Sequence, residues 1–416
     1  MTDQPDLDYT IPTAEPGVPA AAAENIFVAL ARELALTHKV AASVPIRRLP
    51  ILQTPEFFES LLQRAYQHFS QVAEGELIAS YAGEWLLDNY YIVQQALRQV
   101  QEDMPRRYYA ELPRLASTDL QGYPRIYSLA RLYTDVADRQ FSLQQVSALT
   151  EAYQEHAPLT MGELWAWPVM MRVSMLENLV LALNDLLPLG IDPGTIAPTA
   201  AMVGQTRDSS AENIVAHCIT SLRQLGTQDW AVFFEATSRV ETILRRDPSA
   251  TYAQMDFDTR NRYRQVIETI VRRAPASEEQ VAQAALALAQ EAAERNGYVG
   301  RHVDVPFLED PTAHVGYYLI GPGRRQTETA ARYQFSWGES LARRIADRRL
   351  FFYLGDVLLL TLAIILLAAR YAALSGGSLI QVVVAGLLAL LPASAVAVNL
   401  VNWAVSRLVA PHVLPK

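Results

Sequence analysis

Two nearly continuous apolar runs near the C-terminal end constrain this chain more than any other feature. They cover residues 350–370 and 379–403, and each has about the 20 residues that a helix needs to cross a bilayer. The segment between them contains the turn-forming run Ser-Gly-Gly-Ser at 375–378. We therefore predict two transmembrane helices that return antiparallel as a hairpin.

The charges that flank the two runs predict the orientation of the hairpin. The connecting side carries only Arg370, whereas arginines and a lysine cluster outside the runs, at Arg343, Arg344, Arg348, Arg349, Arg407 and Lys416. Basic residues accumulate on the cytoplasmic side of membrane proteins. Both chain ends are therefore expected in the cytoplasm, with 404–416 as an exit segment.

Three polar residues inside the spans are candidate functional groups. Asp356 either pairs with Arg348 or Arg349 near the membrane surface, or belongs to a polar pathway, because intramembrane carboxylates are costly and often functional. Asn399 and Asn402 either join the two helices by hydrogen bonds or act as ligands. The sequence favours the structural alternative for all three.

The rest of the chain has the periodicity of amphipathic helices, which predicts an all-α protein. Residues 1–24 are rich in Pro and Ala and contain no Lys or Arg, so they read as a disordered tail without the basic region of a signal peptide. The predicted parts that follow are a first helical subdomain at 25–187, a linker at 188–210, a second helical subdomain at 211–296, a Gly- and Pro-rich structured loop at 297–325 with one short strand at 315–320, and a basic juxtamembrane helix at 326–349.

A third apolar run, at 164–187, is long enough to cross a membrane, but its charged residues argue against that assignment. Thr160 and Glu163 have the spacing of a capping box, and the sequence from 164 to 187 is mostly apolar. Its polar residues are Arg172, Glu177, Asn178 and Asp185, which would cost several kcal/mol in hydrocarbon. We predict a helix buried in protein and kinked at Pro168.

Charge and cysteine content exclude several function classes. The formal net charge is -9, whereas a nucleic-acid-binding protein needs a basic face. The single cysteine, Cys218, excludes an intrachain disulfide and a zinc site built from cysteines. We expect a buried thiol.

Short acidic and histidine-containing motifs supply no convincing catalytic site. Asp256 and Asp258 form an Asp-x-Asp string that either holds a divalent metal or contains a helix N-cap, at Asp258 or Thr259. His302, Asp304 and His314 are either metal ligands or part of a hydrogen-bonded loop; the second reading is favoured because no helical zinc motif is present.

Glu309 and Asp310 are adjacent, so their side chains diverge and do not form a glycosidase pair. The sequence also lacks a nucleophile elbow, a phosphate-binding loop and a dinucleotide-binding glycine motif. We assign no catalytic, cofactor-binding or metal-binding residue. The tyrosines and tryptophans of 81–167 pack on each other or on sugar rings, and core packing is the favoured reading.

An ordered series of strings resembles the N-terminal region of bacterial cyclic β-1,2-glucan synthases. The resemblance runs over residues 45–416 and rests on EWLLDNYYIV at 84–93, DMPRRYY at 103–109, GYPRIY at 122–127, PLTMGELWA at 158–166, TRNRYR at 259–264, HVGYYLI at 314–320 and LPAS at 391–394. It implies a large multi-pass enzyme of the bacterial inner membrane that makes cyclic glucan from UDP-glucose through a glucan attached to the protein.

The family's transferase domain would follow Lys416, and the sequence stops there. UDP-glucose and a divalent metal are therefore expected in that domain, and none of its catalytic residues is carried over. The leading hypothesis is the helical and anchoring portion of such a synthase, with membrane lipid and the transferase domain, or a split-gene product that carries it, as partners. The alternative is a stand-alone membrane-anchored scaffold without enzymatic activity; a self-sufficient enzyme is a third, disfavoured hypothesis.

Overall fold

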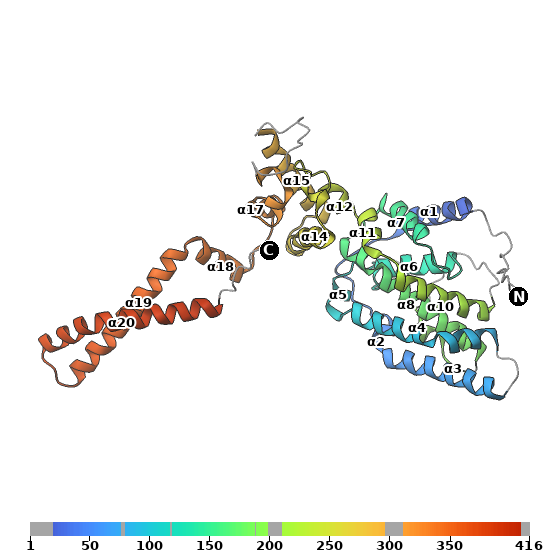
Figure 1. The fold of residues 1–416 in the computed structure, drawn as a ribbon, viewed down its shortest axis with the longest axis horizontal. Helices are drawn as coiled ribbons and strands as arrows, with labels where there is room; N and C mark the ends of the chain where they lie inside the picture. The colour runs from blue at the N-terminus through green and yellow to red at the C-terminus, as the bar shows by residue number, and fades with distance from the viewer. Residues whose placement is uncertain are drawn as a thin grey trace, which may run out of the picture. The chain divides into compact units, whose positions relative to one another are not determined.

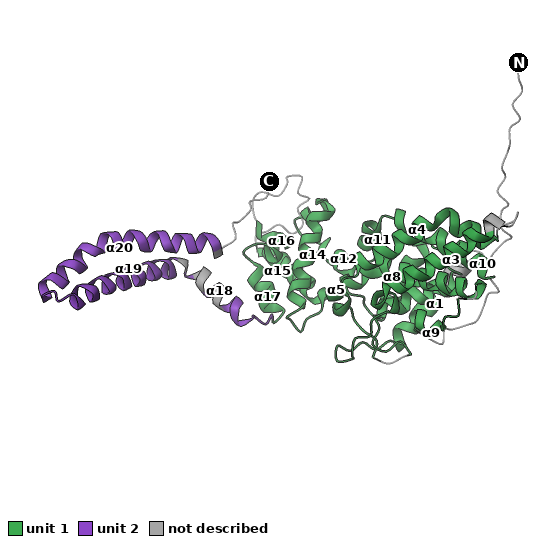
Figure 2. Cartoon of the chain, turned by 90° about the horizontal axis from the view of Figure 1, so that it is seen from below, with its two compact units in different colours: residues 1–332 green, residues 333–416 purple. Residues whose placement is uncertain are grey.

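The computed structural model describes residues 20–75, 80–116, 119–187, 189–198, 210–295 and 311–408. In these residues the chain forms twenty α-helices, one short 3₁₀ helix and no named strand (Figure 1). The all-α prediction is confirmed. The chain divides into two compact units, Met1–Arg332 and Tyr333–Lys416 (Figure 2). Most of the predicted tail lies outside the described residues.

The first unit contains seventeen of the helices. In chain order they are α1 (Ala20–Thr37), α2 (Pro50–Gln53), α3 (Pro55–Gly75), α4 (Tyr81–Asp103), α5 (Arg106–Glu111), α6 (Arg125–Val136), α7 (Leu143–Gln154), α8 (Met161–Leu186), α9 (Pro193–Ile196), α10 (Ala211–Thr227), α11 (Trp230–Thr237), α12 (Arg239–Leu244), α13 (Thr251–Gln254), α14 (Phe257–Val271), α15 (Glu278–Arg295), α16 (Val315–Leu319) and α17 (Arg324–Ala330). The 3₁₀ helix, Pro311–Ala313, precedes α16.

Helix α8 is the centre of this unit. Thr160 and Glu163 form the predicted capping box at its start, and α4, α6 and α10 pack around it. The helix is long and apolar enough to cross a membrane, but most of its apolar stretch is buried inside the protein. The prediction of a buried helix is confirmed, with Pro168 inside one continuous α8.

Helix α10 follows the predicted linker and returns to the same bundle. Its apolar residues Val215, Ile219 and Leu222 are buried, and the helix packs against α8 and α4. The periodic apolar face explains this return, because an amphipathic helix must cover that face with neighbours. The segment 199–209 lies outside the described residues.

A second group of helices within the first unit surrounds α15, which packs against α12, α14, α16 and α17 (Figure 1). The strand predicted at 315–320 is wrong, because the structure places α16 there. Gly316 is closely packed in this helix: a Cβ at this position would lie 2.5 Å from His314 Nε2 and 2.6 Å from Tyr263 Oη, and α16 packs against α14 and α15. Close packing on α14 and α15 therefore overrides the strand propensity of the aromatic run.

The second unit contains α18 (Trp337–Asp347), α19 (Arg349–Leu374) and α20 (Leu379–Leu408). The structure divides the helix predicted at 326–349 into α17 and α18. Arg332 has a left-handed backbone, with φ of 57°, which ends α17, and Ser336 starts α18 with its own capping box. A left-handed residue cannot continue a right-handed helix.

The predicted hairpin is confirmed as α19 and α20, which pack side by side along their length (Figure 2). Gly376 turns the chain with a φ of 81°. On α20 the buried residues Ala393, Ala397 and Val401 recur every four positions, so small side chains let the two backbones approach. The outward leucines remain exposed, as expected of helices that face lipid.

Candidate functional sites

Of the three polar residues predicted inside the spans, Asn402 is the one with a described hydrogen bond to the other span. Asn402 accepts a hydrogen bond at Oδ1 from Tyr353 Oη, with a distance of 3.1 Å. This contact joins α19 to α20 and supports the structural reading of Asn402. Asp356 and Asn399 lie on the exposed surface of the hairpin. The structure does not describe the side chain of Arg349, so its pairing with Asp356 stays a prediction.

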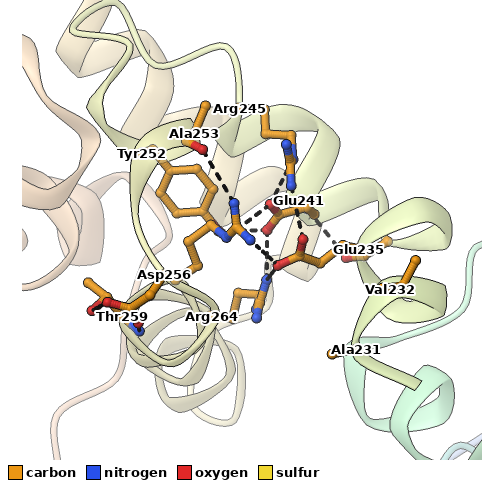
Figure 3. A network of polar contacts seen from close by, with 12 residues as sticks. Ala231, Val232, Glu235, Glu241, Arg245, Tyr252, Ala253, Asp256, Thr259 and Arg264 are labelled. Atoms are coloured by element: carbon orange, nitrogen blue, oxygen red, sulfur yellow. Dashed lines mark hydrogen bonds and ion pairs between the residues drawn. The ribbon is translucent and has the colours of Figure 1, made fainter. Parts of the chain in front are cut away.

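The densest polar cluster lies between α11, α12 and α14 (Figure 3). Glu241 is fully buried and accepts hydrogen bonds from Arg264 Nη1 at 2.8 Å, Tyr252 Oη at 2.7 Å and Arg245 Nε at 2.9 Å. Burial, together with this neighbouring carboxylate, raises the pKa of Tyr252. The sequence predicted none of these contacts, which join residues up to 23 positions apart.

A second carboxylate completes the ion-pair network. Glu235 lies 2.6 Å from Arg260 and 3.0 Å from Arg245. The Arg264 guanidinium carbon lies 4.8 Å from the ring centre of Phe257 and 4.9 Å from that of Phe234. Cation–π contacts of this kind are worth most where water is excluded. The carboxylates are thus held by arginines, as in a structural network.

Trp165 connects this network to the helix at the centre of the first unit. Its ring stacks on Phe234 with 4.4 Å between centroids and meets Phe257 edge-on. Because Trp165 belongs to α8, these aromatic contacts hold the α11–α14 region against the central bundle. Aromatic pairs add roughly 0.5–1.5 kcal/mol beyond the burial of their area.

The Asp-x-Asp string serves as a helix start. Asp256 is the N-cap of α14 and accepts hydrogen bonds from the Thr259 N–H at 2.7 Å and the Thr259 hydroxyl at 3.0 Å. The backbone hydrogen bond lowers the pKa of Asp256. The predicted cap at Asp258 or Thr259 is therefore wrong by two or three positions, since helix ends are the least predictable part of an element.

Asp247 and His314 form a buried pair that connects α12 to α16. Asp247 Oδ2 lies 2.7 Å from His314 Nδ1 and accepts from Ser249 Oγ at 2.6 Å, while Oδ1 accepts from the Val315 N–H at 3.0 Å. Burial tends to raise the pKa of Asp247, but the hydrogen bonds from His314, Ser249 and Val315 outweigh it and hold the pKa below its usual value.

This arrangement does not have the geometry of a nucleophilic triad. In such a triad the acid and the serine bind opposite nitrogens of the imidazole. Here Asp247 and Ser249 both lie at Nδ1, and Nε2 lies 3.3 Å from Tyr263 Oη. His302, Asp304, Glu309 and Asp310 are outside the described residues, so a joint site with His314 is untested. Within the described residues no cluster of three potential ligands could hold a metal.

Glu163 and Glu177 of α8 have buried partners, whereas Asp185, near the end of the helix, is exposed. Arg125 donates two hydrogen bonds to Glu163, of 2.6 and 2.8 Å, and both side chains are almost fully buried. Glu177 accepts a 2.6 Å hydrogen bond from Tyr127, and burial raises the pKa of Glu177 to about 8. The sequence predicted that these charges lie in a protein interior, but it did not identify their partners.

Glu278 of α15 binds the start of α8. Its Oε2 accepts a 2.7 Å hydrogen bond from the Met161 N–H, and burial raises the pKa of Glu278 to about 7. A carboxylate at a helix N-terminus is favoured by the helix dipole. The contact therefore joins the helices around α15 to the bundle around α8, in addition to the contacts of Trp165.

A surface cleft of about 290 Å³ lies between α4 and α10. It is lined by Glu84, Trp85, Asp88, Asn89 and Arg223. Asn89 interrupts the helical backbone of α4 and accepts a hydrogen bond from Arg223. Of the twelve tyrosines and tryptophans of 81–167, five are buried in the core: Tyr109, Tyr127, Tyr133, Tyr153 and Trp167. The prediction of core packing is confirmed for these five residues, whereas five others, Trp85 among them, are half-buried and Tyr81 and Tyr91 are exposed.

Comparison with known proteins supports the resemblance read from the sequence. No known protein-family profile matches the chain. The cyclic beta-(1,2)-glucan synthase NdvB of Rhizobium meliloti (strain 1021) is 30% identical over 414 residues, which cover 83% of this chain and 14% of the relative. The resemblance is confirmed, and the chain spans about one seventh of that relative's length. The similarity and the exposed apolar hairpin together indicate a membrane protein related to a glucan synthase.

Proposed function

We propose that these residues form the N-terminal helical and membrane-anchoring portion of a cyclic β-1,2-glucan synthase. The observation that carries the proposal is the 30% identity to a cyclic glucan synthase over 83% of this chain. The hairpin α19–α20 supplies the anchor, because its outward surface is apolar and exposed. We place the protein in the bacterial inner membrane, with both chain ends in the cytoplasm.

The proposed role is to hold a transferase domain at the inner face of the membrane. The network around Glu241, the Trp165 contacts and the Glu278 hydrogen bond make the first unit a stiff support. The hairpin continues from this unit through α18. We place UDP-glucose and its divalent metal in the transferase domain, and we assign no catalytic residue to this chain.

A chimeric synthase tests the proposal. The segment of a cyclic glucan synthase that aligns with this chain is replaced by residues 1–416, and a matched chimera lacks 349–408. Membranes that carry each chimera are supplied with UDP-glucose and Mg²⁺, and cyclic glucan is measured relative to the amount of chimera in the membrane. We expect glucan from the first chimera and its loss from the second.

Two results would contradict the proposal. A complete chimera that reaches the membrane but makes no glucan would favour the alternative, a stand-alone membrane-anchored scaffold. Transfer or hydrolysis of UDP-glucose by the purified 416-residue chain would show that the active site is not where we place it.

A further inference from the structure

We propose that α18 lies flat on the membrane surface and binds anionic lipid headgroups. Trp337, its first residue, has 84% of its surface exposed, and the preceding Phe335 is 44% exposed. Large aromatic side chains are rarely so exposed without a partner, and tryptophan is enriched at membrane–water interfaces. The inference rests on the proposed function in one respect, the insertion of α19 and α20 into a bilayer.

The sequence of α18 has the pattern of an interfacial helix. At 100° per residue, the apolar residue types at positions 337, 341 and 345 share one side. The charged types at positions 339, 343 and 347 share the opposite side. Arg344, about two turns after Trp337, lies instead on the apolar side, where its long side chain can reach the headgroups. A short helix with this segregation can bury one face among lipid headgroups and keep the other in water.

The structure fixes where this helix begins. Ser336 accepts a hydrogen bond from the Glu339 N–H, and Glu339 accepts one from the Ser336 N–H, as a capping box. The Tyr333 hydroxyl lies 3.4 Å from both Glu339 carboxylate oxygens. The cap sets the exposed Trp337 at the first helical position. The aromatic side chain therefore belongs to the helix and not to a loose linker.

The charge of the segment selects the kind of membrane. Four arginines occur within the seven residues 343–349, against one acidic residue, Asp347. The guanidinium of Arg343 lies 4.3 Å from the ring centre of Phe335. Each basic residue near an anionic bilayer surface contributes about 1 kcal/mol of attraction.

The position of the segment sets its depth. Only Arg348 separates α18 from α19, and α19 begins at Arg349. Exposed apolar side chains follow at once, with Leu350 and Phe351 each 72% exposed. The end of α18 is therefore held at the level of the headgroups wherever α19 enters the bilayer. A lipid surface is thus the partner that the charge and the neighbouring span both favour.

Fluorescent labels on the two faces of α18 test the inference in the full chain. Gly338 lies on the apolar side, and a Cβ added there meets no atom within 4 Å. Asp347 lies nine positions further on, which places it on the opposite side and closer to α19. Gly338→Cys and Asp347→Cys are each labelled with a fluorophore and reconstituted in phosphatidylglycerol vesicles that contain a lipid-bound nitroxide quencher.

The native cysteine does not interfere with this design. Cys218 is fully buried, and its burial raises the pKa of the thiol to about 12, so little reactive thiolate forms at neutral pH. The unsubstituted chain is the labelling control. We expect the label at 338 to be quenched about two-fold more than the label at 347. Equal quenching, or stronger quenching at 347, would mean that α18 points away from the bilayer and would overturn the proposal.

The lipid headgroup is tested by exchanging the vesicles and the arginines. In phosphatidylcholine vesicles the difference in quenching between the labels at 338 and 347 should shrink by at least about half. The combined change Arg343→Gln, Arg344→Gln and Arg348→Gln should have the same effect in phosphatidylglycerol. A difference that is unchanged by both exchanges would refute the headgroup contribution.

Two controls separate this inference from the proposed function. Three exposed arginines of the first unit, Arg106, Arg246 and Arg262, are changed to Gln to match the loss of charge, and these changes should leave the labels unaffected. A label at Leu362→Cys reports insertion of α19. If the label at 362 is not quenched, the anchoring proposal fails. If it is quenched while the labels at 338 and 347 are quenched equally, only the inference about α18 fails.

Discussion

Helices α8 and α19 have the same length and opposite surroundings. Each has 26 residues, and both are apolar enough to cross a membrane. The apolar stretch of α8 is largely buried by protein, whereas none of the corresponding stretch of α19 is buried. The two helices also differ in where their charges lie: α8 contains Glu163, Arg172 and Glu177 among its buried residues, while α19 has Asp356 at an exposed position and presents leucines to its surroundings.

This comparison shows that apolar length alone does not identify a membrane span. A buried charge must have a partner, because an unpaired one costs several kcal/mol. Glu163 is paired with Arg125, and Arg172 donates to the Leu225 carbonyl. Glu177 accepts a hydrogen bond from Tyr127, and burial raises the pKa of Glu177 to about 8, which favours its uncharged form. Helix α8 can therefore remain in a protein interior only while these partners are present.

The largest expected effect follows from removing one such partner. Arg125→Met keeps most of the side-chain volume but leaves Glu163 buried without its guanidinium. We expect the free energy of unfolding of the first unit to fall by about 3–5 kcal/mol. Denaturant unfolding of the detergent-solubilised chain, followed by circular dichroism, measures this loss.

An exposed pair of similar geometry is the matched control. Arg32 donates two hydrogen bonds to Glu155, of 2.7 and 2.8 Å, and both side chains are about half exposed. Arg32→Met should lower the free energy of unfolding far less than Arg125→Met, because water screens an exposed ion pair. Similar losses for the two variants would show that burial does not set the strength of the Arg125–Glu163 pair.

The second prediction compares apolar residues of the two helices. Leu176 in α8 is fully buried, and Leu359 in α19 is 68% exposed. Leu176→Ala leaves a cavity and should lower the free energy of unfolding of the first unit by about 3 kcal/mol. Leu359→Ala should leave this quantity unchanged within about 0.5 kcal/mol. A large effect of Leu359→Ala on the first unit would contradict the division of the chain into two units.

Local sequence signals predicted much of the fold. The capping box at Thr160, the burial of α8 and the hairpin were all predicted, because each depends on residues close together in the chain. The Gly316 segment shows where such signals fail. Its aromatic run favours a strand, but the segment forms helix α16. In this helix Tyr263, 53 positions away in the chain, leaves no room for a side chain at Gly316.

The polar networks were less predictable than the helices. Glu241 and Arg264 are 23 positions apart, and Asp247 and His314 are 67 apart. A single sequence shows the residue types of such pairs but not which acid meets which base. The acidic residues most conspicuous as a motif, Asp256 and Asp258, provide a helix cap, whereas Glu241, at the centre of the network, carries no motif.

Glu177 should make the stability of the first unit depend on pH. Burial raises its folded-state pKa to about 8, above the value of about 4.3 expected in an unfolded chain. The folded state therefore binds the proton more tightly than the unfolded state does. The stabilisation that this provides is fully present below the unfolded-state pKa and is lost as the pH rises toward 8. Between about pH 5.5 and about pH 7 we expect a loss of about 2 kcal/mol.

Glu177→Gln tests the assignment of this pH dependence. The amide cannot ionise, so the variant should lose the part of the pH dependence of unfolding free energy that Glu177 causes. It keeps an oxygen that accepts the hydrogen bond from Tyr127. Glu278, whose pKa burial raises to about 7, contributes a slope of the same sign, and Glu278→Gln measures it separately. An unchanged slope in Glu177→Gln would show that Glu177 is ionised in the folded state.

The smallest expected effect concerns the hairpin itself. The hydrogen bond from Tyr353 to Asn402 joins α19 to α20, and interhelical hydrogen bonds in membranes contribute about 0.6 kcal/mol on average. Asn402→Leu should weaken the pairing of the two helices by about that amount, whereas Asn399→Leu, at a position with no described hydrogen bond to α19, should not. The pairing is measured by disulfide exchange between cysteines introduced in α19 and α20 of the reconstituted chain. Equal effects of the two substitutions would mean that a polar group anywhere near this end of α20 is sufficient. A larger effect of Asn399→Leu would reverse the assignment and make Asn399 the residue that joins the two helices.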